Sequence, residues 1–148
     1  MKVSDALGGV RSLFLDTAPI IYYVENVSPY RQRMDEIVAR VAAGTVGFVT
    51  SSITLAECLI HPIRRSDAAL AARFRLAITQ GVNTRYIGVD HVVEQAAEHR
   101  AKLGFSLTDA LQIAAAISAG CDAFLTNDRD LVKAPGMRVI VLDDLEPG

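Results

Sequence analysis

The sequence predicts an α/β protein with three layers, in which helices cover both faces of a central parallel sheet of four to five strands. Three observations predict this fold. Short apolar runs of strand length alternate with longer segments of helical periodicity. The helical segments are long enough to form the crossovers that parallel strands require. The length of 148 residues suits one domain, so we expect a single domain over residues 1–148.

The first third of the chain begins the alternation. Residues 12–16 form a short apolar run that predicts a strand, and Thr17 stands where a helix begins directly after it. A second helix is expected from Ser28, with apolar residues at helical spacing until Gly44 ends it. Residues 46–50 then predict the second strand.

Two helices follow, over residues 53–60 and 67–80. Ser51 or Ser52 is placed to cap the first of them, and Ser66 is placed to cap the second. The remaining predicted elements are, in order, a strand over residues 84–89, a charged amphipathic helix over 90–103, an apolar helix over 107–119 capped by Ser106, and strands over 123–126 and 138–142.

Acidic residues stand at the ends of these predicted strands. In parallel α/β sheets, ligands bind beyond the carboxyl ends of the strands. Asp16 ends the first strand, Glu57 lies in the first turns after the second, and Asp128 lies just past the fourth. The helix that starts near Asp109 must run away from the same edge, because Gly120 turns the chain into the beginning of the fourth strand. Four carboxylates distant in sequence are therefore expected to converge.

Such convergence requires a neutralising partner. Two unit charges about 4 Å apart repel by roughly 4 kcal/mol at an effective dielectric constant of 20. Protonation can relieve the repulsion, but clusters of carboxylates favour Mg²⁺ or Mn²⁺. A bound divalent cation lowers the pKa of a water ligand and neutralises charge on phosphate oxygens. The pattern therefore indicates hydrolysis of phosphodiesters.

Four segments carry a resemblance to a known family. In chain order they are FLDTAPIIYY, SSITLAECL, SLTDALQIAAAI and FLTNDRDL. Together they resemble the PIN-domain ribonucleases, and the length is similar to that of the VapC-type toxins of toxin–antitoxin pairs. The resemblance implies a PIN-like fold and an endoribonuclease that requires Mg²⁺ or Mn²⁺. It also implies a homodimer that a small cognate antitoxin holds inactive.

The resemblance also assigns roles to residues. Asp16, Glu57, Asp109 and Asp128 match the catalytic acids that bind the metal. The supporting positions are Thr126 and Asn127, with Asp130 as an acid of the outer shell. Leu131 departs from the pattern, which commonly has Phe there, and this exchange concerns packing more than chemistry.

Arginines supply a candidate contact to RNA. The net charge of −2 gives no overall basic character, but a local cluster is still able to bind phosphate. The residues that fall close together in sequence, and that we expect to contact RNA, are Arg64, Arg65, Arg73 and Arg75. The alternative for each is an exposed position on a solvated helix.

Each acid has a purely structural alternative. Asp16 can cap the helix that follows it, and Asp128 can close an Asx turn. Glu57 fits a capping box with Thr54, and Asp109 fits the third position of a helix capped by a serine. Asp130 stands where solvated turn residues are common.

The sequence bears on three alternatives to a nuclease. A phosphatase of the haloacid dehalogenase type needs an acid two residues after the first, where this chain has Ala18. A receiver domain needs a Lys after the last strand, which is missing. A PIN-like module that binds RNA or protein without cleaving it remains open.

The remaining features are less specific. Cys58 and Cys121 form no CxxC pair, so we expect buried free thiols rather than a disulfide or a zinc site. The chain lacks an apolar stretch long enough for a membrane span and an export signal at its start, so we expect a cytoplasmic protein without membrane contact.

Overall fold

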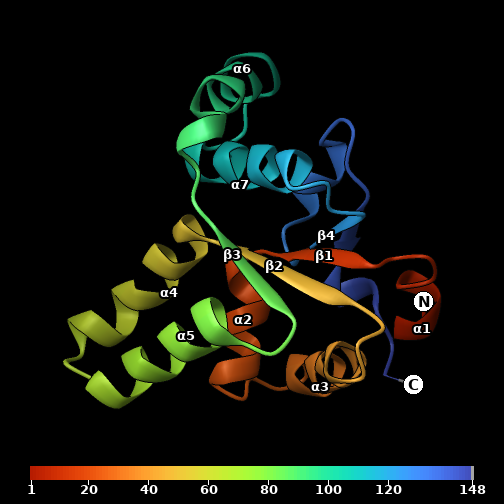
Figure 1. Cartoon of the computed structure of the whole chain (residues 1–148), viewed down its shortest axis with the longest axis vertical. Coiled ribbons are helices and arrows are strands. Elements are labelled where there is room, and N and C mark those ends of the chain that lie inside the picture. The colour runs from red at the N-terminus through yellow and green to blue at the C-terminus, as the bar shows by residue number, and fades with distance from the viewer. Residues whose placement is uncertain (148) are drawn as a thin grey trace.

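The computed structural model describes residues 1–147 and confirms the predicted three-layer architecture (Figure 1). Five parallel strands form one sheet in the order β3-β2-β1-β4-β5. Phe14 of β1 pairs with Val49 of β2 on one side and with Phe124 of β4 on the other. The strands are β1 Ser12–Leu15, β2 Gly47–Ser51, β3 Thr84–Ile87, β4 Ala123–Thr126 and β5 Val139–Val141.

The helices connect successive strands and cover the sheet. The α-helices are α1 Val3–Ala6, α2 Thr17–Val24, α3 Tyr30–Ala42, α4 Ser52–Arg64, α5 Ala68–Gln80, α6 Val93–Leu103 and α7 Leu107–Ser118. Three short 3-10 helices complete the described chain: η1 Asp90–Val92, η2 Arg129–Lys133 and η3 Leu142–Asp144. Among residues 1–147, no helix has the length and apolar character needed to cross a membrane.

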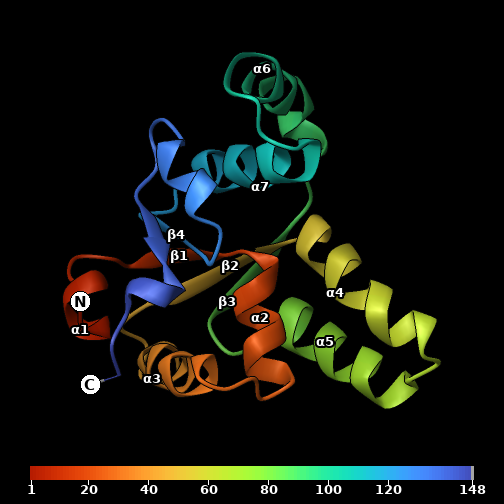
Figure 2. The ribbon, with the colours of Figure 1, turned by 180° about the vertical axis from the view of Figure 1, so that it is seen from behind.

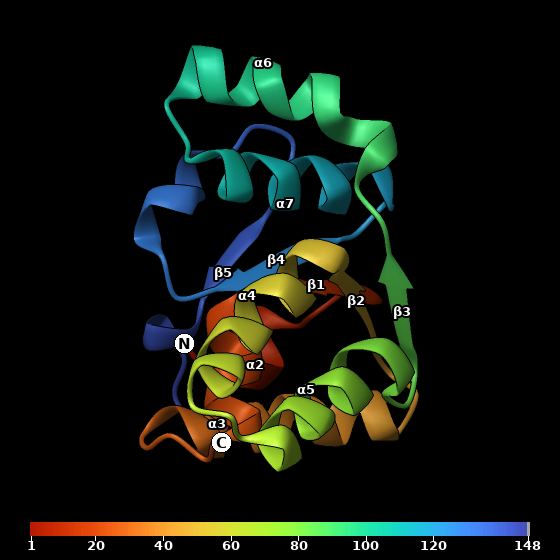
Figure 3. The same ribbon diagram turned by 90° about the vertical axis from the view of Figure 1, so that its left-hand side faces the viewer.

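The two faces of the sheet form separate hydrophobic clusters because side chains alternate along each strand. Phe14 and Phe124 point to the side covered by α7, where their rings stack with centroids 5.0 Å apart. Leu13, Leu15 and Leu125 point to the opposite side, against α2, α3, α4 and α5. Figure 3 shows these layers, with α6 outside α7. The apolar character of the strands follows from burial on both faces.

The structure corrects several local predictions. Helix α1 was not predicted, because four residues are too few for a periodic pattern. Helix α4 continues past residue 60 to Arg64 and includes the buried Pro62, although Pro62 has no amide hydrogen to donate to the carbonyl of Cys58. The cap of α5 is Asp67, whose carboxylate accepts from the amide of Leu70 at 3.0 Å, and not Ser66.

Both cysteines are free, as expected. Cys58 is buried in α4, whereas Cys121 is only half-buried, so the expectation of burial is wrong for the second thiol. Burial raises the pKa of the Cys58 thiol to about 12, which keeps it protonated at neutral pH.

The strand order creates a switch point at the centre of the sheet. The chain moves outward from β1 to β2 and β3, and then returns to β4 on the other side of β1. Connections that leave β1 and β4 therefore diverge, and such divergence leaves a crevice at the carboxyl ends of these strands. Asp16 and Asp128 follow the two strands that border this crevice.

Candidate active site

Asp16 is the innermost of the predicted acids. It follows β1 directly, caps α2, and is only 9% exposed. Its Oδ1 accepts from the amide of Thr17 at 2.9 Å, and its Oδ2 accepts from the hydroxyl of Thr126 at 2.7 Å. The capping role that was weighed as an alternative is thus present, but it uses only one of the two carboxylate oxygens.

Burial determines the protonation of Asp16. Desolvation raises its pKa from 3.8 to about 6, although the hydrogen bonds from Thr126 and Thr17 act in the opposite direction. The negative charges of Asp109 and Glu57 add to the rise. A carboxylate buried beside other carboxylates is a feature of functional sites, because burial of such a group without a compensating partner is costly.

Glu57 reaches the site from α4. Its Oε1 accepts from the hydroxyl of Thr17 at 2.7 Å, so one threonine contacts two of the predicted acids, Asp16 through its amide and Glu57 through its side chain. The capping-box alternative for Glu57 is wrong. The cap of α4 is Ser51, and Thr54 lies inside the helix.

Asp109 lies half-buried in the first turn of α7. Its amide donates to the hydroxyl of Ser106 at 3.2 Å, which confirms the predicted serine cap. Desolvation raises the pKa of Asp109, and its hydrogen bond with Ser106 opposes this rise. Repulsion from Asp128 and Glu57 adds to it, so Asp109 interacts electrostatically with acids from two other segments.

Asp128 follows β4 in a tight turn. Its amide donates to Thr126 Oγ1 at 3.0 Å, and its Oδ1 accepts from the amide of Asp130 at 3.0 Å. The Asx-turn alternative is therefore present at Asp128, and it again leaves one carboxylate oxygen available. Asp130 is exposed, and its charge contributes to the pKa rise of Asp109.

Asn127 connects this turn to two other segments. Its side-chain amide donates to the hydroxyl of Tyr22 in α2 at 3.4 Å. Its Oδ1 accepts from the amide of Asp143 at 2.9 Å. Asn127 thus ties the turn after β4 to α2 and to the C-terminal segment, which is consistent with support of the turn.

The four acids lie at one edge of the sheet and interact electrostatically with one another. Asp16 is affected by Asp109 and Glu57, and Asp109 is affected by Asp128. In the part of the chain that the structure describes, no three Asp, Glu, His or Cys side chains are grouped closely enough to hold a metal ion as they stand. Their roles as catalytic residues and metal ligands stay a prediction.

The chemistry of these side chains fits a hard divalent cation. The predicted ligands offer only carboxylate oxygens, which Mg²⁺ and Mn²⁺ prefer over nitrogen or sulfur. Glu57 and Asp128 each use one oxygen in the hydrogen bonds described above, so the second oxygen of each is available. The raised pKa of Asp16 indicates a site where a positive partner would stabilise the ionised form.

A groove of about 540 Å³ leads away from Glu57 between α2 and α4. Its walls include Thr17 and Ile21 on the α2 side, and His61 and Arg65 on the α4 side. Figure 2 shows α4 and α5 lying side by side and extending away from the sheet. Glu57 is the predicted acid that lines the groove, and Glu25, at the end of α2, lines it together with the basic His61 and Arg65.

The predicted arginines occupy different environments. Arg73 donates from its guanidinium to the carbonyl of Val24 at the end of α2, so it stabilises the packing of α5 on α2. All four predicted arginines, Arg73 included, are exposed. Of the four predicted arginines, Arg65 alone lines the groove, and contact with RNA stays a prediction for all four.

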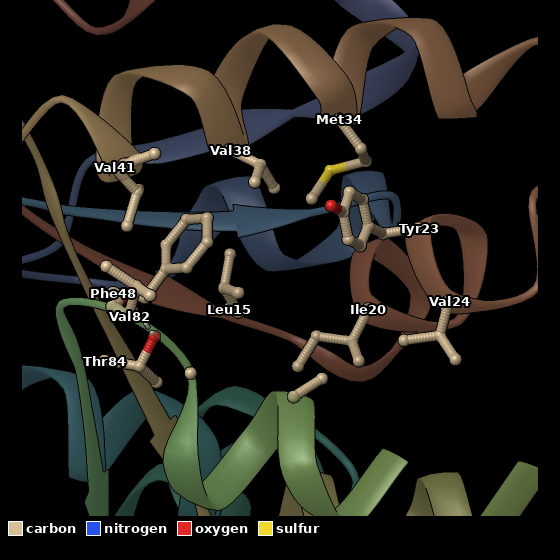
Figure 4. A pocket seen from close by; sticks show the side chains of 13 residues that line it. Leu15, Ile20, Tyr23, Val24, Met34, Val38, Val41, Phe48, Val82 and Thr84 are labelled. Atoms are coloured by element: carbon tan, nitrogen blue, oxygen red, sulfur yellow. Dashed lines mark hydrogen bonds between the residues drawn. The ribbon is translucent and has the colours of Figure 1, made fainter. Parts of the chain in front are cut away.

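A second cavity lies on the α2, α3 and α5 side of the sheet and does not contain any of the predicted acids. It has a volume of about 250 Å³ and an almost entirely apolar lining (Figure 4). Leu15, Met34, Val41 and Phe48 line it, and the hydroxyl of Tyr23 is one of its few polar groups. It belongs to the packing of the core and supplies no group for phosphate chemistry.

Polar residues beneath the acids were not predicted. Ser51, Thr54 and Gln112 are buried and bonded to one another, and Thr17 joins two of the acids. Ser51 was considered only as a cap. The one signal in the sequence was Gln112 itself, a polar residue in an otherwise apolar helix.

Comparisons with known proteins agree with this architecture. The family model described as PIN domain matches residues 13–137. No curated protein is significantly similar to the chain in sequence.

Three solved structures illustrate the likeness of fold. VapBC2 from Rickettsia felis, bound to a DNA fragment from its promoter, gives a TM-score of 0.69 at 14% identity, covering 88% of this chain and 98% of that one. A toxin–antitoxin complex from Klebsiella pneumoniae gives a TM-score of 0.64 at 19% identity, and the match covers 88% of this chain and 97% of that one. Mycobacterium tuberculosis VapC20, a toxin that cleaves the sarcin–ricin loop, gives a TM-score of 0.68 at 20% identity. The match covers 83% of this chain and 95% of that one.

Proposed function

Because this chain belongs to the PIN domain family, we propose that it is a metal-dependent endoribonuclease and the toxin of a toxin–antitoxin pair. The observation that carries the proposal is the set of acids from four separate segments at the carboxyl edge of the sheet. Buried Asp16 lies among them with a raised pKa. The packing of the core does not require this arrangement, whereas metal-assisted hydrolysis of a phosphodiester uses carboxylates to hold the cation.

The residues that would hold Mg²⁺ or Mn²⁺ are Asp16, Glu57, Asp109 and Asp128. When bound, the ion supplies a water of lowered pKa and positive charge for the phosphate oxygens. Thr17 orients Asp16 and Glu57 together, and Thr126 holds the other oxygen of Asp16 while fixing the turn of Asp128. The protein thus contributes acids already oriented by hydrogen bonds, which reduces the cost of organising them during the reaction.

The proposal extends to RNA and to protein partners. VapC20, of similar fold, is described as cleaving the sarcin–ricin loop, and the Klebsiella structure is a toxin–antitoxin complex. These likenesses support RNA as the substrate and a small cognate antitoxin as the inhibitor. The family resemblance further supports a homodimer.

The proposed function is tested by incubating purified protein with structured RNAs in the presence of Mg²⁺ or Mn²⁺, and then with EDTA. We expect cleavage with either ion, complete loss with EDTA, and recovery when excess Mn²⁺ is restored. The Asp109→Asn variant, purified in the same way, is expected to be inactive and controls for contaminating nucleases.

Two outcomes would contradict this function. Equal cleavage by wild type and Asp109→Asn would indicate a contaminant. Binding of RNA without cleavage at millimolar Mn²⁺ would instead support a PIN-like binding module.

A second prediction concerns Arg65 in the groove. The Arg65→Gln variant is expected to raise the KM for RNA several-fold, with little change in kcat, because Arg65 caps the C-terminal end of α4, about two helical turns beyond Glu57, where we expect it to contact only flanking phosphates. The dependence of binding on salt concentration should become less steep.

The matched control for this prediction is Arg11→Gln. Arg11 is also exposed, but it precedes β1 at the opposite edge of the sheet. Steady-state kinetics at two salt concentrations measure both variants. An equal effect of the two substitutions would show that only total charge matters.

A further inference from the structure

A buried polar network lies beneath the acidic residues. Gln112 of α7 is 1% exposed and sits among alanine and isoleucine side chains. Its side-chain NH₂ donates to Thr54 Oγ1 at 2.6 Å, and its carbonyl accepts from the hydroxyl of Ser51. Thr54 in turn donates to the carbonyl of Leu15 at 3.3 Å. Ser51 Oγ also accepts from the amides of Ile53 and Thr54, which caps α4.

This network joins the elements that carry three of the acids. Leu15 directly precedes Asp16. Thr54 lies three residues before Glu57 in α4, and Gln112 lies three residues after Asp109 in α7, so each pair occupies the same face of its helix. A single amide therefore connects the end of β1, the first turn of α4 and the first turns of α7.

We infer that Gln112 is a positioning residue, which holds together the segments of β1, α4 and α7 that carry Asp16, Glu57 and Asp109, so that these side chains can turn toward one divalent cation. This inference rests on the proposed function. The acids repel one another, and this repulsion tends to move α4 and α7 apart. Apolar contacts alone resist such a displacement weakly because they have little directional preference, whereas the two hydrogen bonds of Gln112 have fixed directions and lengths.

The chemistry of the side chain explains why Gln is present at this position. Its amide supplies a donor for Thr54 and an acceptor for Ser51 at once, and it adds no charge to an already acidic region. A shorter Asn would place the amide one methylene away from both hydroxyls. An apolar residue of similar length, such as Met, would fill the space and leave both hydroxyls without this partner.

The experiment compares Gln112→Met and Gln112→Asn with wild type by two measurements. The first is the rise in melting temperature as Mn²⁺ is added, which reports binding of the ion to the folded protein without any turnover. The second is RNA cleavage against Mn²⁺ concentration, at a temperature where each protein is fully folded. We expect both variants to need at least about tenfold more Mn²⁺ for half of the effect in each measurement, as is usual when a partner of metal ligands is lost.

The matched control is Ile113→Val, with Ile113→Ala as a more destabilising version. Ile113 is the next residue of α7 and is fully buried. It belongs to the hydrophobic cluster of Phe14 and Phe124 and is not part of the polar network. Both Ile113 variants should lower the melting temperature without changing the Mn²⁺ concentration needed. If Gln112→Met behaves in the same way, Gln112 has a purely structural role and the inference is overturned. If Mn²⁺ does not raise the melting temperature of wild type and wild type does not cleave RNA, the proposed function is contradicted. The inference about Gln112, which rests on that function, is then contradicted as well.

Discussion

The Asp16→Asn variant is expected to lose RNA cleavage by roughly a thousandfold and, at neutral pH, to be more stable than the wild-type protein. Loss of a ligand removes several kcal/mol of transition-state stabilisation, and each 1.36 kcal/mol corresponds to a factor of ten in rate. The gain in stability follows from the buried charge. Asn is neutral, fits the same space, and still accepts from the amide of Thr17 through its Oδ1, although its NH₂ no longer accepts from the hydroxyl of Thr126.

The pKa of Asp16 determines how the stability difference between the two proteins depends on pH. Asp16 has a pKa raised from 3.8 to about 6, so the folded protein binds its proton more tightly than the unfolded chain. The favourable contribution of Asp16 to the free energy of unfolding is present below pH 4 and is lost as the pH rises through 6. A shift of this size corresponds to on the order of 3 kcal/mol at pH 7. Asn does not ionise, so the Asp16→Asn variant does not lose this stability as the pH rises.

The measurement is the melting temperature of both proteins between pH 4 and pH 8. We expect similar values near pH 4 and an advantage of roughly 6 to 12 °C for Asp16→Asn at pH 7, at about 2 to 4 °C per kcal/mol for a chain of this length. Mn²⁺ should raise the melting temperature of wild type only.

The control for Asp16→Asn is Asp5→Asn, which removes one exposed charge from α1. It should change neither cleavage nor the pH dependence. A lower melting temperature of Asp16→Asn at pH 7 would contradict our account of the buried charge.

The Thr126→Val variant is expected to reduce cleavage by about 10- to 100-fold at pH 7, in the range typical for residues that hold metal ligands. Thr126 is fully buried and donates to Asp16 Oδ2, which lowers the pKa of that carboxyl against the effect of burial. Without this bond the pKa rises further, so Asp16 holds a proton over more of the neutral range. Thr126 also accepts from the amide of Asp128, and that contact is lost too.

The profile of activity against pH distinguishes this effect from general damage. In Thr126→Val the profile should move to higher pH, so that part of the activity returns at pH 8 to 9. Thr126→Ser keeps the hydroxyl and should retain most of the activity with an unchanged profile. If Thr126→Val and Thr126→Ser lose cleavage activity equally at all pH values, the methyl group of Thr126 matters rather than its hydrogen bond.

The layers of the fold were predictable from the sequence because they depend on local periodicity. The strand predicted over residues 123–126 coincides with β4, and the apolar helix predicted over 107–119 corresponds closely to α7. Helix ends were less predictable where two capping residues stood side by side. At Ser66 and Asp67, the choice of the acid as the cap depends on the turn between α4 and α5, where Ser66 has a φ of 54°.

The position of the acids was predictable for a topological reason. Parallel strands end at the same edge, so Asp16 and Asp128 had to share it whatever the order of the strands. Their neighbours were not predictable in this way. The bond between Thr17 and Glu57 spans 40 residues, and that between Thr126 and Asp16 spans 110.

The environments of the four arginines were also not predictable from the sequence. Close spacing in sequence suggested one group, yet Arg73 is bonded to α2 while Arg65 lines the groove. All four are exposed, and only the packing of α4 and α5 against α2 determines which of them bonds to the protein and which lines the groove.

The sequence by itself determined the alternation of strands and helices and the edge at which the acids meet, since both follow from periodicity and from the direction of parallel strands. Only the tertiary structure decided which polar groups hold those acids, among them Gln112 and Thr126. The reason is that hydrogen bonds between distant segments need distances and directions accurate to fractions of an ångström. No local pattern in the chain specifies them.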